Sequence, residues 1–228
     1  IIEAATEVIK KAKTVASYFF ETSEEDIEFK NGNLTVAGTD KSVSLLELSS
    51  ELKTNFTKPD GMPDTLDVKL DHGGVPSAFP NGCHICEVEI DPDTGAVKID
   101  RYNMVNDFGV LVNPLLVEGQ GHGGVAQGIG QAIMEDVVFD ESGQVLSGSF
   151  MDYALPRASD LPNFHFASEP SPAQTNALGV KGCGEAGCAG AMPSVINAIT
   201  NALSEIGVSK IDMPATPQKI WRAIQEKK

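Results

Sequence analysis

The sequence predicts an α+β protein, in which hairpins and separate helices are mixed rather than arranged in a regular β–α repeat. Two observations support this prediction. Short stretches that alternate apolar and polar residues flank turn-forming sequences at 31–32 and at 91–95. Longer stretches carry apolar residues at helical spacing, near 2–19, 114–135 and 186–205. The chain contains no internal repeat and no low-complexity tract.

The first 58 residues are expected to form a helix, a hairpin and a second helix. Apolar residues from Ile2 to Phe19 form one stripe, and turn-forming residues end that pattern. The segments 27–30 and 33–36 are the expected hairpin strands, because Asn-Gly between them favours a tight turn. A short helix is expected to begin near 44–48.

Residues 59–80 are rich in Pro, Gly and Asp, which predicts a long irregular connection between two parts of the chain. Residues 81–228 are expected to form the main α+β portion. Its predicted elements are strands at 83–90 and 97–105, a helix that Asn113-Pro114 opens and that runs to about 135, a hairpin at 137–146, a strand at 164–168, and helices at 186–205 and from Thr216-Pro217 onward.

Composition and charge exclude several classes of function. The chain has 228 residues and a formal net charge of −15, with a pI of about 4.6. A surface this acidic repels a phosphate backbone, so we expect no nucleic-acid partner. There is no apolar run of 18 residues and no signal-peptide pattern, so we expect no membrane span and a cytoplasmic location. Because the sequence begins at Ile1 inside a helical pattern, we expect a fragment of a longer protein.

The cysteines offer one candidate metal site, which the strand pattern argues against. Cys83 and Cys86 have the spacing of half a zinc or iron–sulfur site. They fall in a predicted strand, however, where side chains three positions apart face opposite sides. We therefore expect no metal site here and reduced, buried thiols instead. His84, His122 and His165 are interpreted as structural, although His122 lies close to Gln120 in the sequence, and His72 falls in the irregular connection.

The segment 179–187, Gly-Val-Lys-Gly-Cys-Gly-Glu-Ala-Gly, is the strongest candidate for chemistry. Its glycines permit close backbone approach, and the segment leads directly into a predicted helix. Glu185 therefore lies near a helix N-terminus, where the helix dipole favours its ionised form. A carboxylate on such a loop suits a general base. The structural alternative is that Glu185 caps the helix and the glycines only form a tight turn.

A second glycine-rich segment, 119–130, lies within a predicted helix. Glycine inside a helix costs roughly 1 kcal/mol relative to alanine, so this abundance needs a reason. Close packing against another element and contact with a cofactor are the two explanations. Gln120 can donate and accept through one amide, which suits a polar heterocycle or a metal-bound oxygen. The segment lacks the strand–turn–helix context of a dinucleotide-binding motif.

Several segments, in order along the whole chain, resemble the molybdopterin-binding large subunit of the xanthine dehydrogenase, aldehyde oxidase and aerobic carbon monoxide dehydrogenase family. The similarity is carried by the following motifs: 79–84 (Phe-Pro-Asn-Gly-Cys-His), 119–131, 152–157 (Asp-Tyr-Ala-Leu-Pro-Arg), 179–187 and 211–217. The resemblance implies the C-terminal part of such a subunit, with the molybdenum-cofactor-binding domain fold of the aldehyde oxidase type.

The resemblance also implies roles for individual residues. Glu185 occupies the position of the family's general base, in a hydroxylation whose oxygen atom comes from water. The implied cofactor contacts are Gln120, Gly121, Lys181, Gly182, Cys183 and Gly184, and no protein side chain is expected to bind the metal. The substrate is expected to be an aldehyde, an N-heterocycle or a similar small molecule.

The chain is much shorter than large subunits of the family. We therefore expect it to form one wall of an active site, to lack turnover on its own and to bind no molybdenum cofactor alone. The implied partners are the upstream half of the same subunit and iron–sulfur and flavin (FAD) subunits or domains. Two alternatives stay open, namely a non-catalytic assembly module and a metal- or thiol-based redox domain that uses the four cysteines.

Overall fold

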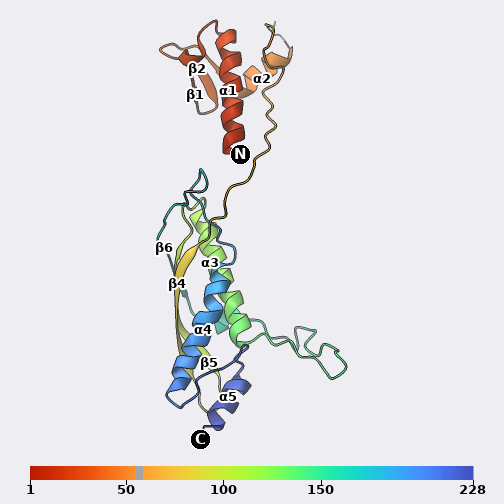
Figure 1. The fold of residues 1–228 in the computed structure, drawn as a ribbon, viewed down its shortest axis with the longest axis vertical. Helices are drawn as coiled ribbons and strands as arrows, with labels where there is room; N and C mark the ends of the chain where they lie inside the picture. Colours follow the sequence, from red (N-terminus) through yellow and green to blue (C-terminus); the bar gives the residue numbers. More distant parts are fainter. Residues whose placement is uncertain (55–58, 228) are drawn as a thin grey trace. The chain divides into compact units, whose positions relative to one another are not determined.

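The computed structural model describes residues 1–54 and 59–227 and divides the chain into two compact units, 1–74 and 75–228 (Figure 1). The division falls within the Pro- and Gly-rich stretch 59–80, which contains no helix or strand. None of the described helices combines the length and the apolar composition needed to cross a membrane.

The N-terminal unit is a helix and a small antiparallel sheet. Its elements are α1 (Ile2–Phe19), a 3₁₀ turn η1 (Glu24–Asp26), β1 (Ile27–Lys30), β2 (Asn33–Val36), β3 (Ser42–Ser44) and α2 (Leu45–Thr54), with strand order β1-β2-β3. Asn31 and Gly32 both have positive φ, of 51° and 80°, as a two-residue hairpin turn requires. Apolar side chains from the helices and the sheet, including Val15, Leu34 and Leu48, form the core of this unit.

A three-stranded sheet is the base of the C-terminal unit. It contains β4 (Asn81–Ile90), β5 (Val97–Asp107) and β6 (Phe164–Ser168), in the order β4-β5-β6. β4 and β5 form the predicted antiparallel hairpin, whereas β6 pairs with β5 in parallel. Tyr102 and Met104 of β5 are fully buried beneath the helices that cover the sheet.

Three helices complete this unit: α3 (Pro114–Ile133), α4 (Ala186–Ser204) and α5 (Pro217–Gln225). Asn113 caps α3 by accepting a hydrogen bond from Leu116 N, and Thr216 caps α5 in the same way. α3 and α4 lie side by side and pack against the sheet (Figure 1). The mixture of helices and small sheets confirms the predicted α+β class.

The expected hairpin at 137–146 is present as an antiparallel turn, but it contains no β-strands. The segment 136–155, here called the arm, projects from the body of the C-terminal unit after α3 (Figure 1). In the first half of the arm, a single antiparallel bridge joins Phe139 to Val145, and no strands form. A two-stranded hairpin with no sheet or helix beneath it is marginal in water, and the apolar side chains here are exposed. The short strand β3 and a 3₁₀ turn, η2 (Ala158–Asp160), were not predicted.

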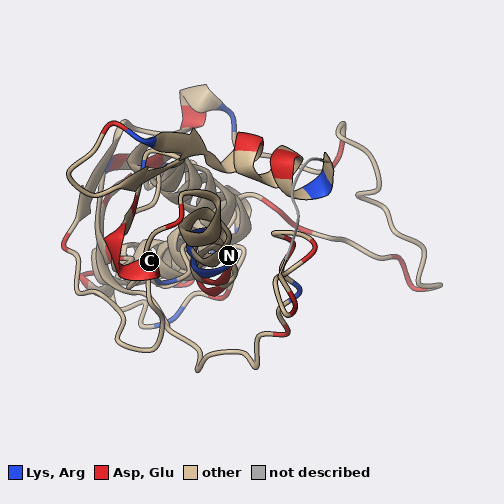
Figure 2. Ribbon diagram, turned by 90° about the horizontal axis from the view of Figure 1, so that it is seen from above, with Lys and Arg blue, Asp and Glu red and all other residues tan. Residues whose placement is uncertain are grey.

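Acidic side chains outnumber basic ones and are spread along the ribbon instead of gathering in one cluster (Figure 2). Consistent with this distribution, the described part of the chain contains no group of three or more His, Cys, Asp or Glu side chains that could hold a metal ion.

Candidate functional site

The glycines of α3 allow the two helices to approach closely. A Cβ built on Gly128 would lie 2.6 Å from the Cβ of Ala191 and 2.9 Å from the carbonyl oxygen of Cys188. On Gly124 it would lie 3.0 Å from Cys188 N. On Gly187 of α4 it would lie 2.5 Å from a carbonyl oxygen of α3. Helix packing therefore explains these glycines, and it brings the two glycine-rich segments of the sequence together.

A hydrogen bond joins the two segments directly. Gln120 Nε2 donates to the carbonyl oxygen of Gly184 over 2.7 Å. Gln120 is exposed at the N-terminal half of α3, and Gly184 precedes the first residue of α4 by two positions. The bond fixes the peptide of the residue that immediately precedes Glu185.

Glu185 occupies the N-cap position of α4, but its side chain does not cap the helix. It accepts no hydrogen bond from a backbone N–H of the first turn, and its backbone is already close to helical, at φ −113° and ψ −1°. The residue is exposed. The carboxylate therefore does not cap the helix, which is the role that the structural alternative gave to Glu185. It follows directly after the peptide group to which Gln120 donates its hydrogen bond.

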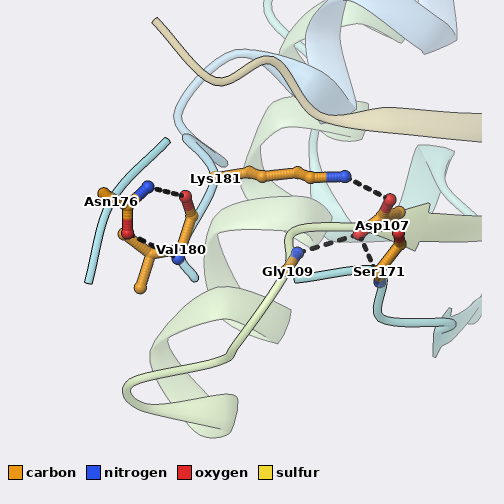
Figure 3. Close-up of polar contacts among 6 residues, drawn as sticks. All are labelled: Asp107, Gly109, Ser171, Asn176, Val180 and Lys181. Atoms are coloured by element: carbon orange, nitrogen blue, oxygen red, sulfur yellow. Dashed lines mark hydrogen bonds and ion pairs between the residues drawn. The ribbon is translucent and has the colours of Figure 1, made fainter. Parts of the chain in front are cut away.

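An ion pair binds the first half of the 179–187 segment to the end of β5 (Figure 3). Lys181 Nζ lies 2.5 Å from Asp107 Oδ2, and both side chains are largely buried. Asp107 Oδ1 also accepts hydrogen bonds from the backbone N–H groups of Gly109 and Ser171, each at 2.9 Å. The hydrogen bond from Lys181 and these two backbone bonds lower the pKa of Asp107 to about 2.

A second set of bonds holds the same loop from its other side. Asn176 Nδ2 donates to the carbonyl oxygen of Val180, and Val180 N donates to Asn176 Oδ1 (Figure 3). Lys181 N donates to the carbonyl oxygen of Phe108. Lys181 was expected at the cofactor, and the structure directs its ammonium group to Asp107. Asp107 was missed by the sequence reasoning, because a single acidic residue at the end of a strand gives no local signal.

Four of the glycines near Glu185 have no packing partner in this chain. A Cβ built on Gly119, Gly123, Gly182 or Gly184 would meet no atom within 4 Å. Within the described residues, the backbone N–H groups of 182–184 donate no hydrogen bond. Open space and unpaired N–H donors at the start of a helix suit an anionic group such as a phosphate. The residues present therefore fit a phosphate-bearing pterin cofactor.

The other expected contacts divide into two groups. Cys183 lies with Gly182 and Gly184 in the open loop before α4 and is partly exposed. Gly121 differs, because it is buried and a Cβ there would lie 3.3 Å from Met104 and Phe166. Gly121 thus faces the core of the unit rather than the loop.

The cysteines show no arrangement suited to metal or disulfide chemistry. All four are free thiols. The expectation of buried thiols is wrong for Cys83, which is exposed because it lies on the face of β4 away from α4. Cys86, on the opposite face, is partly buried toward α4. Burial raises the pKa of Cys86 to about 12, so its thiol stays protonated near neutral pH. These features argue against the alternative of a cysteine-based redox domain.

Comparison with known proteins shows the family to which the chain belongs. Residues 1–162 match the molybdopterin cofactor-binding domain family, and the chain belongs to that family. Its relatives place it among the molybdenum-containing hydroxylases. It is 38% identical over 222 residues to the nicotine 6-hydroxylase large subunit of Paenarthrobacter nicotinovorans, which covers 96% of this chain and 27% of that subunit.

Solved structures of related enzymes have the same fold. The quinoline 2-oxidoreductase of Pseudomonas putida 86 superposes with a TM-score of 0.82 at 33% identity, over 98% of this chain and 29% of that one. The carbon monoxide dehydrogenase of Oligotropha carboxidovorans superposes with a TM-score of 0.87 at 28% identity, over 98% and 28%. This chain thus spans less than a third of the length of the relatives that it matches.

Proposed function

We propose that this chain forms one wall of the active site of a molybdenum hydroxylase and that Glu185 is its general base. The observation that carries the proposal is the position of Glu185. Its carboxylate is exposed at the start of α4, is not used as a helix cap, and follows a peptide that Gln120 fixes at 2.7 Å. A general base needs a held backbone and an available carboxylate, and both are present here.

The side chains around Glu185 have separate tasks in this proposal. Gln120 and the N–H groups of 182–184 would hold the molybdenum-pterin cofactor, which supplies the two-electron redox chemistry of the hydroxylation when bound. Glu185 takes a proton from the water-derived oxygen and so raises its nucleophilicity toward an electron-poor carbon of the substrate. The pair of Lys181 and Asp107 keeps the loop in place during this transfer.

The substrate class is proposed from the relatives. Nicotine and quinoline appear in the names of two of them, so we propose a small N-heterocycle or aldehyde as substrate. Because those relatives are subunits several times longer than this chain, we propose that the rest of such a subunit and iron–sulfur and flavin partners complete the enzyme. On its own, the chain is expected to show neither turnover nor bound molybdenum.

The direct test compares Glu185→Gln with the wild type in the enzyme assembled with its upstream half and partner subunits. Glu205→Gln, at the opposite end of α4, is a matched control. We expect Glu185→Gln to lower kcat by about 10²- to 10⁴-fold, as loss of general base catalysis does, with molybdenum content unchanged. Full turnover of Glu185→Gln on a panel of aldehydes and N-heterocycles would rule out the assigned role.

A second function, in assembly, is favoured by the arm. Its apolar side chains are unusually exposed, reaching 57% at Phe139, 85% at Phe150 and 92% at Met151. Exposed apolar side chains concentrated on one segment mark interaction surfaces in soluble proteins. We propose that the arm docks on another part of the assembled enzyme. Both functions are compatible in one chain.

A further inference from the structure

The first half of α4 lies directly on the imidazole ring of His84 in β4. A Cβ built on Gly190 would lie 2.4 Å from two atoms of that ring, so no other residue fits at this position without movement of the helix or the ring. Gly190 is five residues after Glu185, which is about 7.5 Å along a helix. The ring of His84 thus limits how the catalytic end of α4 approaches the sheet.

A chain of hydrogen bonds, here called the His84 relay, connects this ring to the same helix. His84 Nδ1 lies 2.7 Å from the hydroxyl of Tyr102 on β5, and that hydroxyl lies 3.0 Å from Ser194 Oγ on α4. On the other side of the ring, His84 Nε2 lies 3.3 Å from Asn106 Oδ1. The relay therefore spans β4, β5 and α4.

With the Asn106 amide oriented as in the structure, a neutral His84 ring sets the direction of its bond to Tyr102, because each hydroxyl carries only one hydrogen. His84 Nε2–H donates to Asn106 Oδ1, which leaves Nδ1 to accept from the hydroxyl of Tyr102. The single hydrogen of Ser194 is then shared between the Tyr102 oxygen, at 3.0 Å, and the carbonyl oxygens of Gly190 and Ala191, at 2.9 and 3.1 Å. If His84 were protonated, both ring nitrogens would donate, and the hydroxyl of Tyr102 would have to turn toward Ser194.

The surroundings favour the neutral state. Tyr102 is fully buried and Asn106 is 3% exposed. Burial lowers the pKa of His84, and burial raises the pKa of Tyr102 to about 12. A pocket of about 430 Å³ adjoins the relay, and its lining includes no Asp, Glu, Lys or Arg. Besides burial, the neighbouring Cys86 also raises the pKa of Tyr102.

We infer that His84 is a positioning residue. It acts through Tyr102 and Ser194 to hold α4 in one register against the sheet, and this register determines the position of Glu185. The inference rests on the proposed role of Glu185. An apolar side chain of similar size would support the helix equally well, but it would not select one register. Buried polar networks have that selecting effect through the hydrogen bonds that they make. The bonds among His84, Tyr102 and Ser194 are made, and at the end of the relay the buried Asn106 Nδ2 has no partner among the described residues.

The first part of the test needs only this chain. Nitrogen-15 NMR of the wild type is expected to show His84 as the Nε2–H tautomer at neutral pH. Tyr102→Phe removes the donor to Nδ1 while keeping the aromatic ring, and Ser194→Ala removes the last hydroxyl of the relay. We expect Tyr102→Phe to alter the tautomer signature of His84. An unchanged signature, or an Nδ1–H tautomer in the wild type, overturns the relay.

The second part uses the assembled enzyme. Tyr102→Phe and Ser194→Ala are each expected to lower kcat by roughly 10- to 100-fold, the scale of a misplaced catalytic group, with KM and molybdenum content unchanged. The double variant should lose no more than the larger single effect, because both changes break one unit. Ser204→Ala, whose hydroxyl bonds only within the end of α4, is the control.

The possible failures can be told apart. Full kcat in Ser194→Ala and Tyr102→Phe, together with an inactive Glu185→Gln, overturns the positioning role and leaves the proposed function standing. Full turnover in Glu185→Gln removes the proposed function and this role with it. If Tyr102→Phe fails to fold, Ser194→Ala alone decides, since it deletes one oxygen atom from a half-buried site.

Discussion

Gln120 and Gly184, 64 residues apart in the chain, are joined by one hydrogen bond of 2.7 Å from a side-chain amide to a backbone carbonyl. The bond ties α3 to the residue before Glu185. Both groups are exposed to solvent, so water can replace the amide when it is removed. Gln120→Leu is therefore expected to lower the free energy of unfolding by only about 0.5–1.5 kcal/mol, while it loosens the loop.

Hydrogen exchange can measure that loosening. The amides of 182–185 should exchange faster in Gln120→Leu than in the wild type, with the rest of α4 unaffected. Gln127→Leu is the matched control, because Gln127 is an exposed glutamine on the same helix. Equal exchange in the two variants would show that the bond does not hold the loop.

The pair of Asp107 and Lys181 predicts a dependence of stability on pH. The pKa of Asp107 is lowered to about 2 in the folded chain, whereas an unfolded Asp titrates near ~3.9. The ionised carboxylate therefore stabilises the fold above roughly pH 4, and this stabilisation is lost as the pH falls from about 4 through 2. Asp107→Asn should be less stable than the wild type at pH 7, and the difference should shrink at pH 2.

Urea unfolding at pH 7, 4, 3 and 2 tests this prediction. The control is Asp93→Asn, at a turn residue for which the described structure shows no side-chain hydrogen bond. Its difference from the wild type should stay small at every pH. A constant difference between Asp107→Asn and the wild type across the series would mean that the ion pair is not what stabilises the loop.

The glycines of α3 predict opposite effects of one substitution at two positions. Gly128→Ala places a methyl group 2.6 Å from Ala191 and should cost about 1–3 kcal/mol through overpacking. Gly123→Ala meets no atom within 4 Å and should stabilise the helix by about 0.5–1 kcal/mol. Chemical denaturation of the two variants measures both values. Stabilisation by Gly128→Ala would contradict the close packing of α3 and α4.

Local patterns were enough to predict most of the fold. The Asn31-Gly32 turn, the hairpin of β4 and β5, and the caps at Asn113 and Thr216 all depend on neighbours within a few residues. The parallel pairing of β5 with β6 joins Tyr102 to Phe164, more than 60 positions apart, and no local pattern encodes it. The two strands expected in the arm do not form. The alternation of apolar and polar residues in a sequence does not show whether a sheet lies nearby for a strand to pair with.

For the same reason, some residues of the candidate site could be predicted from the sequence and others could not. Glu185 and Gln120 stand in glycine-rich segments that are unusual in themselves, and both could be selected from the sequence. Asp107 and His84 acquire their partners only through the fold, from Lys181 and from Tyr102. His84 was interpreted as structural because a single histidine in a strand carries no information about a serine on a helix 110 residues later.

The arm predicts that two substitutions affect assembly and leave folding unchanged. Phe150 and Met151 are 85% and 92% exposed, so replacing both with serine should change the free energy of unfolding of this chain by less than about 0.5 kcal/mol. The same variant should co-purify less well with the rest of the enzyme. Leu46→Ser, at a residue 82% exposed on α2, is the control for general surface effects. Unchanged co-purification would exclude these two side chains from the interface.

The two thiols of β4 are expected to differ in reactivity because they face opposite sides of the strand. Alkylation proceeds through the thiolate. Cys83 is exposed, whereas Cys86 is partly buried and has a pKa of about 12, which leaves very little thiolate at pH 8. Iodoacetamide should modify Cys86 at least ~100-fold more slowly than Cys83, as followed by mass spectrometry of the peptides. The two rates should converge in urea, and equal rates in the folded chain would mean that β4 separates from α4 or that Cys86 faces solvent.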